Sequence, residues 1–403
     1  MEHTYLTGIH IIDVRHLHDI QIPLSRTERK HLVLTGKNGC GKTSVLKSLN
    51  SFLEYMVSDR FQLDDSKERI AEWKDKLRSE DGADRVLAHQ QIKIIEENAR
   101  RKWNDGCIVH VNLPTSMREK HNKGQFILAY YSDSHKLELQ QSQSNAAVEL
   151  KQVYSPDEHP AKHIGEYLLS LKTTQAFAKL KGDKKKVREI DKWFAKFEKV
   201  LRGIYENQEL ELKFDLDTRL FTIHIPDRHP FPLDCMSMGY AAIFDIVGDL
   251  MMRMENQHSY ELEGIVMIDE IETHLHVELQ RAIVPILTDL FPNLQFILTT
   301  HSPFILTSTP NSVVYDLEAD VYVKDGLTDY PYDTIVRSYF ETDLLSRELR
   351  EKLDRYRELV SLENRRPHLA QIKKLENYLD NIPWILSPEF AAEYRQIKLR
   401  AGR

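Results

Sequence analysis

A glycine-rich loop between a short apolar run and a helical pattern constrains this chain more than any other feature. The run His31-Leu32-Val33-Leu34-Thr35 is continuously apolar, as expected for a buried parallel strand. It leads directly into Gly36-Lys37-Asn38-Gly39-Cys40-Gly41-Lys42-Thr43, and residues 44–50 then have helical periodicity. A strand, a G-x-x-x-x-G-K-T loop and a helix in this order predict a phosphate-binding loop. We therefore expect an α/β fold with this loop at the edge of a largely parallel sheet.

Each residue type in the loop suits the binding of phosphate. Glycines let backbone N–H groups turn inward around an oxyanion, a geometry that a Cβ would obstruct. Lys42 can reach the β- and γ-phosphates, and Thr43 offers a hydroxyl to Mg²⁺. A chance glycine-rich turn is the alternative, and the flanking strand and helix argue against it. The expected ligands are ATP and Mg²⁺, and the predicted nucleotide-contacting residues are Gly36, Lys37, Asn38, Gly39, Cys40, Gly41, Lys42, Thr43 and Ser44.

Two other apolar runs end in polar side chains. Residues 264–268 are followed by Asp269 and Glu270, and residues 295–299 lead to His301. Ligands of open α/β sheets bind at the carboxyl ends of the strands. We expect Asp269 to hold Mg²⁺, Glu270 to activate the attacking water as general base, and His301 to donate to a γ-phosphate. An acidic strand end or a single histidine is ordinary by itself, but together with the phosphate loop they predict a hydrolytic site.

These three motifs, in this order, resemble those of ABC ATPases of the soluble, non-transporter branch, which includes the SMC, Rad50, RecF and OLD-type proteins. The chain is most similar to stand-alone AAA-family ATPases of bacterial defence operons, such as the Septu and PARIS systems. The resemblance covers about residues 6–310. It implies a P-loop ATPase fold of the ABC type, with a mixed, mostly parallel sheet, helices on its faces, helical insertions and a helical tail.

The resemblance also implies a signature motif before the Asp269 strand, and Met236-Ser237-Met238-Gly239-Tyr240 is the candidate. Ser237 suits a helix N-cap with a free hydroxyl, and Gly239 would let a phosphate approach the helix end. Met238 and Tyr240 depart from the usual Leu-Ser-Gly-Gly-Gln form, and an ordinary capped core helix is the alternative. In the family, this helix faces the γ-phosphate held by another subunit, which implies a homodimer or a higher homo-oligomer. The family also has a glutamine that senses Mg²⁺, and Gln125 is the candidate metal ligand.

Composition argues against several classes of protein. No stretch approaches the roughly 20 apolar residues of a membrane helix, and the first residues do not resemble a signal peptide. Three widely spaced cysteines favour a reducing compartment, so we expect a cytoplasmic protein without a membrane partner. The net charge of −7 means that nucleic acid would need a local basic patch. The lysine-rich segment 179–199 is one candidate, although such runs are more often solvated helix faces with core aromatics.

The patterns along the chain predict six segments: an N-terminal ATPase lobe with the phosphate loop (1–57), a charged helical arm (58–104), the rest of that lobe (105–155), a helical insertion (156–208), a C-terminal ATPase lobe (209–338) and a helical tail (339–403).

The resemblance implies a switch in which ATP joins two protomers and hydrolysis by Glu270 releases them. About a hundred residues follow His301, too few for the Toprim nuclease of OLD-type proteins. We therefore expect a separate effector protein in anti-phage defence, such as the HNH nuclease of a Septu operon. A DNA-repair clamp of the RecF or Rad50 kind is the alternative. A transporter subunit is a third class, which the helical insertions and the unusual signature argue against.

Overall fold

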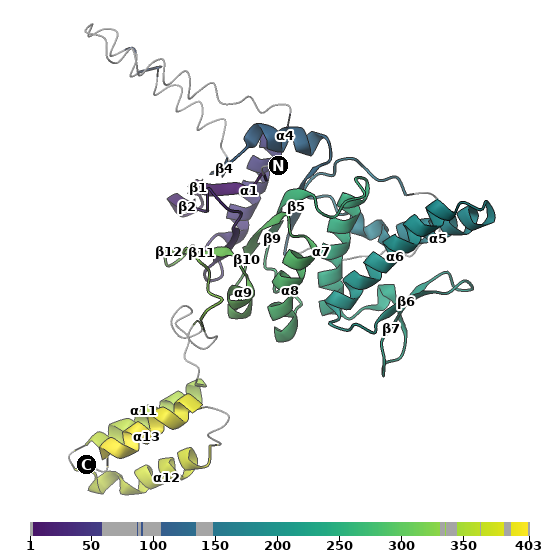
Figure 1. Cartoon of the computed structure of the whole chain (residues 1–403). Coiled ribbons are helices and arrows are strands. Elements are labelled where there is room, and N and C mark those ends of the chain that lie inside the picture. The colour runs from purple at the N-terminus through teal and green to yellow at the C-terminus, as the bar shows by residue number, and fades with distance from the viewer. Residues whose placement is uncertain are drawn as a thin grey trace. The chain divides into compact units, whose positions relative to one another are not determined.

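The computed structural model describes two compact units, residues 1–329 and 330–403 (Figure 1). The charged helical arm predicted for residues 58–104 lies almost entirely outside the described residues. The described residues are 3–58, 106–133, 148–330, 345–362, 364–382 and 388–401, together with positions 87, 90, 91 and 335.

A six-stranded sheet forms the centre of the first unit, in the order β12-β11-β3-β10-β9-β5. The strands from β11 to β5 are parallel to their neighbours, and β12 is antiparallel to β11. The mixed, mostly parallel sheet predicted from the sequence is therefore confirmed. Its strands are β3 (His31–Thr35), β5 (Phe126–Tyr131), β9 (Glu263–Ile268), β10 (Leu294–Thr299), β11 (Ser312–Asp316) and β12 (Val321–Val323).

Helices cover both faces of this sheet, which explains why β3, β5, β10 and β11 are buried at every position. Side chains alternate between the faces of a strand. Ile265 and Met267 share a core with α1 (Lys42–Val57), and that core also includes an antiparallel sheet of β1 (Leu6–Val14), β2 (Leu17–Pro23) and β4 (Cys107–Val111). The opposite face carries α7 (Met238–Glu255), α8 (Val277–Leu290) and α9 (Pro303–Ser308) (Figure 1). A short helix, α4 (Pro114–Asn122), precedes β5.

A helical hairpin and a small sheet lie between β5 and α7 along the chain. The hairpin is η1 (Pro160–His163), α5 (Ile164–Leu180) and α6 (Lys184–Ile204). The sheet is β6 (Glu211–Phe214), β7 (Phe221–His224) and β8 (Phe231–Pro232), followed by η2 (Leu233–Cys235). Of the aromatic side chains of α6, Phe197 is buried and Trp193 and Phe194 are half-buried. The ring centres of Trp193 and Phe197 are 5.3 Å apart, and those of Phe197 and Phe244 of α7 are 5.9 Å apart. These aromatics pack on the core, as the structural interpretation of this segment expected.

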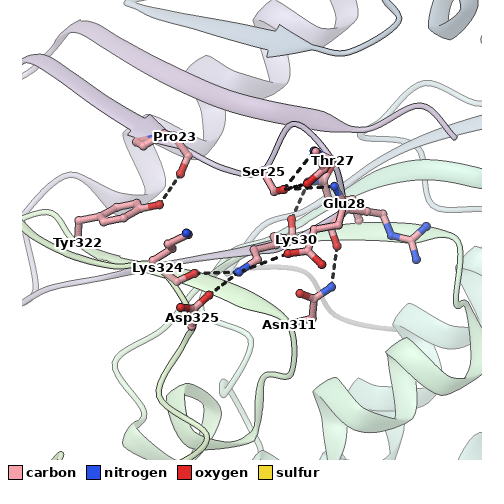
Figure 2. A network of polar contacts seen from close by, with 11 residues as sticks. Pro23, Ser25, Thr27, Glu28, Lys30, Asn311, Tyr322, Lys324 and Asp325 are labelled. Carbon is pink, nitrogen blue, oxygen red and sulfur yellow. Dashed lines mark hydrogen bonds and ion pairs between the residues drawn. The ribbon is translucent and has the colours of Figure 1, made fainter. Parts of the chain in front are cut away.

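Lys30, immediately before β3, binds the segment that follows β12 (Figure 2). Its ammonium donates to Asp325 Oδ1 at 2.7 Å and to the Lys324 carbonyl at 3.3 Å. The hydroxyl of Tyr322, in β12, donates to the Pro23 carbonyl at 2.9 Å. The side chain of Lys30 is almost fully buried, so these contacts replace water as partners of its charge.

The second unit is helical, as predicted for the tail. It contains α11 (Arg347–Ser361), η3 (Arg366–His368), α12 (Leu369–Asp380) and α13 (Pro388–Ala401) around a core of its own. In the parts of the chain that the structure describes, no helix combines the length and the apolar character needed to cross a bilayer.

Candidate nucleotide-binding site

The phosphate loop lies at the carboxyl edge of the sheet, between β3 and α1. Gly36, Gly39 and Gly41 have φ angles of 134°, 88° and 102°, which favour glycine. A Cβ on Gly36 would lie 2.7 Å from the Cys40 sulfur, whereas a Cβ on Gly39 would meet nothing within 4 Å. No side chain caps α1 at Gly41, so the loop can offer the first-turn N–H groups of the helix to an oxyanion.

The ammonium group of Lys42 points into this loop. It donates to the carbonyl oxygens of Gly36 at 2.9 Å and Lys37 at 3.2 Å, and the residue is buried. The Lys42 ammonium thus lies inside the loop, next to the glycine backbone that a phosphate would approach. A phosphate bound there would be neutralised by Lys42 and would accept hydrogen bonds from the loop backbone.

Glu318 holds the outer side of the loop, a contact that the motifs did not predict. It accepts from the Lys37 backbone N–H at 3.1 Å and pairs with the Lys37 ammonium at 3.1 Å. Its partner Lys37 holds the pKa of Glu318 below the ordinary value. Asp316 orders the turn before it by accepting from the Glu318 and Ala319 N–H groups. The only signal for this contact in the sequence was that two acidic residues, Asp316 and Glu318, follow an apolar run.

Asp269 is buried directly after β9, which is separated by β10 from β3, the strand that leads into the phosphate loop. Thr299 donates to its Oδ1 at 2.6 Å, and the Asp269 N–H donates to the Tyr131 carbonyl at 2.8 Å. Its Oδ2 is buried and has no hydrogen-bond partner among the residues that the structure describes. A buried carboxylate oxygen without a protein partner suits a hard cation. Asp269 therefore fits Mg²⁺, which Thr43, at the start of α1, would also contact.

Glu270 has a backbone conformation that is rare for a side chain of its type. Its φ is 48°, and its N–H donates to Thr299 Oγ1 at 2.7 Å. Strained conformations of this kind persist where the surrounding structure enforces them, often at functional sites. Glu270 lines a pocket of about 200 Å³ together with Asp133, Asp269, Met238 and Asp245. Glu270 thus combines an unusual backbone conformation with a place at the pocket beside the end of β9.

His301 completes this edge of the sheet. Its Nε2 lies 3.8 Å from Glu270 Oε1 and, within the described part of the chain, has no hydrogen-bond partner. Burial lowers the pKa of His301, the nearby Lys42 lowers it further, and Glu272 opposes both effects. An imidazole with a lowered pKa is neutral at pH 7, so His301 can donate from one ring nitrogen without carrying charge.

Glu272 positions the His301 loop, a role that the sequence did not reveal. Its Oε1 accepts from the His301 backbone N–H at 2.5 Å, and its Oε2 accepts from Thr300 Oγ1 at 2.7 Å. One carboxylate therefore joins the loop after β9 to the loop after β10. The sequence contained the residue two positions after Glu270, but the partners are 28 and 29 residues away.

The signature candidate is placed as predicted in one respect and differs in another. Ser237 is the N-cap of α7, is exposed, and makes no side-chain cap bond. Gly239, however, is buried, and a Cβ there would lie 2.8 Å from Leu279 Cδ1 and 3.3 Å from the His274 carbonyl. The expectation that Gly239 admits a phosphate is corrected, because its missing side chain lets α7 approach α8 and the preceding loop.

Gln125 is not brought to this site. It is exposed and immediately precedes β5, which pairs in parallel with β9 from Phe126 opposite Glu263 to Tyr131 opposite Ile268. At about 3.3 Å per residue, Gln125 lies roughly 20 Å from the edge that carries Asp269. Its assignment as a metal ligand is therefore corrected. Ser132 and Asp133, at the other end of β5, line the pocket with Asp269.

Comparisons with known proteins relate parts of this chain to one family model and to several curated proteins. A family model described as "AAA domain, putative AbiEii toxin, Type IV TA system" matches residues 118–307. The chain is 24% identical over 394 residues to the Septu protein PtuA of Bacillus mycoides (strain KBAB4), covering 94% of this chain and 50% of that protein. It is 38% identical over 84 residues to the Retron Vc95 probable ATPase of Vibrio cholerae serotype O1 biovar El Tor, covering 20% of this chain and 16% of that protein.

The chain is homologous to the Septu protein PtuA and to the Retron Vc95 probable ATPase. The resemblance that the motifs predict is thus confirmed. The chain spans about half the length of the Septu relative and 16% of the length of the retron ATPase. Among solved structures, the SMC head domain from Thermotoga maritima has a TM-score of 0.38 at 11% identity, with 77% of this chain and 94% of that chain covered.

Proposed function

We propose that the chain binds ATP with Mg²⁺ at the phosphate loop and hydrolyses it to ADP and phosphate. The observation that carries this proposal is the meeting of four groups at the carboxyl ends of three adjacent strands: the phosphate loop, Asp269, Glu270 and His301. Two contacts show that these strands are neighbours. Leu298 of β10 pairs with Ile268 of β9, and the Thr300 N–H after β10 donates to the Leu34 carbonyl of β3 at 3.1 Å. Relatives that carry the name ATPase add support.

Each side chain has a distinct part in this reaction. Lys42 and the loop N–H groups neutralise the phosphate oxygens on which charge develops. Asp269 and Thr43 would hold Mg²⁺, which would neutralise charge on the β- and γ-phosphates. Glu270 accepts the proton of the attacking water, since the pocket beside it gives water access. Neutral His301 donates a hydrogen bond to the γ-phosphate, and Glu272 keeps its loop in place.

We further propose that ATP joins two copies of the chain through Ser237, and that the pair controls a separate effector. The exposed Ser237 at a helix N-terminus and the adjacent exposed Met238 can face a nucleotide in a second copy. ATP shifts the equilibrium because its γ-phosphate contacts Ser237 in the closed pair alone. The similarity to a Septu protein supports a role in anti-phage defence. The cytoplasmic location and an effector nuclease of the HNH class are part of the same proposal and follow from the resemblance of the sequence motifs.

Two substitutions at the site test the ATPase assignment. Lys42→Ala removes the cation that meets the phosphates, so ATP affinity should fall at least about tenfold in calorimetric titration. Glu270→Gln keeps the shape but removes the base, so binding should stay within about twofold while phosphate release falls on the order of 10²- to 10⁴-fold.

Gln125→Ala serves as the control, because this exposed residue lies at the opposite edge of the sheet and should change neither quantity. Hydrolysis by Glu270→Gln at the wild-type rate would contradict the assignment of the base. Nucleic acid degraded by the pure chain would contradict the separate effector.

A further inference from the structure

The exposed side of α6 carries a row of cations. Lys185, Arg188, Lys192, Lys196 and Lys199 follow one another at intervals of three or four residues, which places them on one face of a helix. The apolar residues of α6, among them Ile190, Phe197 and Leu201, are buried on another face. Figure 1 shows α6 beside α5. We call the five cations the α6 basic face.

The acidic residues of α6 are engaged with other partners. Glu189 pairs with Lys186 at 3.4 Å, Asp191 accepts from Gln175 at 2.6 Å, and Glu198 pairs with Arg202 at 2.7 Å. Within the described residues, no ion pair involves Lys185, Arg188, Lys192 or Lys199. Lys196 differs, since its ammonium lies 3.7 Å from the centre of the Tyr260 ring and near Glu261. Four cations of the face are therefore available to an external anion.

The turn that leads into α6 extends this charge. Residues 179–188 contain five lysines and Arg188 but only one acid, Asp183, which accepts from the Lys186 N–H as the N-cap of α6. Lysines 184, 185 and 186 stand in the first turn, where the helix dipole disfavours cations. Helix stability thus does not explain their placement, whereas binding of a polyanion does.

We propose that the α6 basic face binds the phosphate backbone of nucleic acid. From Lys185 to Lys199 the face extends about 21 Å at 1.5 Å per residue. This length matches about six base-pair steps of duplex at 3.4 Å each. A net charge of −7 makes the rest of the chain unsuited to a polyanion, so binding depends on this local cationic surface.

Nucleic acid fits this surface better than a protein or a membrane. The face contains no large apolar side chain, and lysine is depleted from the cores of protein–protein interfaces. Helices that lie on membranes bury an apolar face in the lipid, whereas the apolar face of α6 is already in the core. Phe177 and Leu180 are exposed at the end of α5, which makes an anionic membrane the competing occupant.

Hydrogen bonds connect the helices α5 and α6 to α7, whose first turn borders the proposed ATP site. Trp193 of α6 donates to Glu255 Oε2 at 2.8 Å, and Tyr167 of α5 donates to Glu255 Oε1 at 2.8 Å. Glu255 is the last residue of α7, the helix that begins after Ser237. Bound nucleic acid would therefore act on the same helix that the proposed switch uses, although its binding does not require ATP.

The test compares two variants of the full chain that lose the same charge, both without nucleotide. One replaces Lys185, Arg188, Lys192 and Lys199 by Gln, which preserves helix propensity. The control replaces Lys47, Lys123, Lys373 and Lys374 by Gln, which are exposed elsewhere. Binding to a 20-base-pair DNA duplex, an RNA duplex of the same sequence, and phosphatidylserine vesicles is followed by fluorescence anisotropy and flotation at several salt concentrations.

We expect salt-dependent binding of duplex by the wild-type chain, about 10²- to 10³-fold weaker binding by the α6 variant, and little change in the control. For the α6 variant, the plot of the logarithm of the duplex-binding constant against the logarithm of the salt concentration should have a slope shallower by about 3.6 than for the wild-type chain. This corresponds to about 0.9 for each of the four phosphates that the variant no longer neutralises. The DNA and RNA arms show which backbone is preferred. No wild-type binding, equal weakening in both variants, or binding of vesicles alone would overturn the proposal. Because ATP is absent, none of these outcomes depends on the ATPase assignment.

Discussion

At the scale of single residues, the site depends on side chains that hold other side chains. Thr299 donates to the Asp269 carboxylate and accepts from the Glu270 backbone N–H, so one hydroxyl orients the side chain of Asp269 and the backbone of Glu270. Glu272 does the same for the loop of His301. Such positioning residues need not touch ATP, because a displacement of about 1 Å at a reacting group already lowers the rate.

Substitution of Glu272 tests this role. Glu272→Ala should lower kcat for ATP hydrolysis about 10- to 100-fold and leave KM within about twofold, because His301 would lose its fixed position while the phosphate loop stays intact. Glu272→Gln should restore part of kcat, since its amide oxygen can still accept from the His301 N–H. The measurement is steady-state phosphate release. A parallel rise of KM in both variants would instead indicate a general loss of structure.

At the scale of elements, β3 is held at both ends by the chain around β11 and β12. Lys30 binds Asp325 before the strand, and Lys37 binds Glu318 after it. The phosphate loop is therefore fixed by contacts 281 to 295 residues away in sequence. Helix α7, which begins after Ser237, is fixed differently, by the close approach that Gly239 permits.

A pair of glycine substitutions tests the packing of α7. Gly239→Val should lower the free energy of unfolding by about 1–3 kcal/mol, because its side chain would collide with Leu279 and the His274 carbonyl. Gly203→Val in α6 is the matched control, since a Cβ there meets nothing within 4 Å, and it should stay within about 0.5 kcal/mol. Urea unfolding measures both, and equal effects would contradict the packing role of Gly239.

At the scale of the whole molecule, the proposed pairing of two copies depends on Ser237, which is exposed at the start of α7. The pocket beside Glu270 includes residues of α7 such as Met238 and Ala241, but Ser237 does not line it. Its exposed hydroxyl is thus available for a nucleotide in another chain. The proposed composite site would make assembly depend on ATP.

Light scattering on the Glu270→Gln chain tests this dependence. Its molar mass should double when ATP and Mg²⁺ are added, because bound ATP persists without hydrolysis. Adding Ser237→Arg should abolish the increase, whereas Ser51→Arg, at an exposed position of α1, should not. A mass that ATP leaves unchanged in the Glu270→Gln chain would contradict the shared site.

The sequence by itself determined the local parts of this protein. The phosphate loop, the acidic strand end and His301 each follow an apolar strand, and glycine geometry or strand polarity makes such patterns readable without tertiary information. Only the tertiary structure decided which strands are neighbours and in which direction β5 runs beside β9. Gln125 was misplaced because the sequence does not show that β5 is parallel to β9, which puts Gln125 at the edge opposite Asp269. Glu272, Glu318 and the packing of Gly239 remained hidden for the same reason, since their partners are distant along the chain and meet only when the sheet assembles.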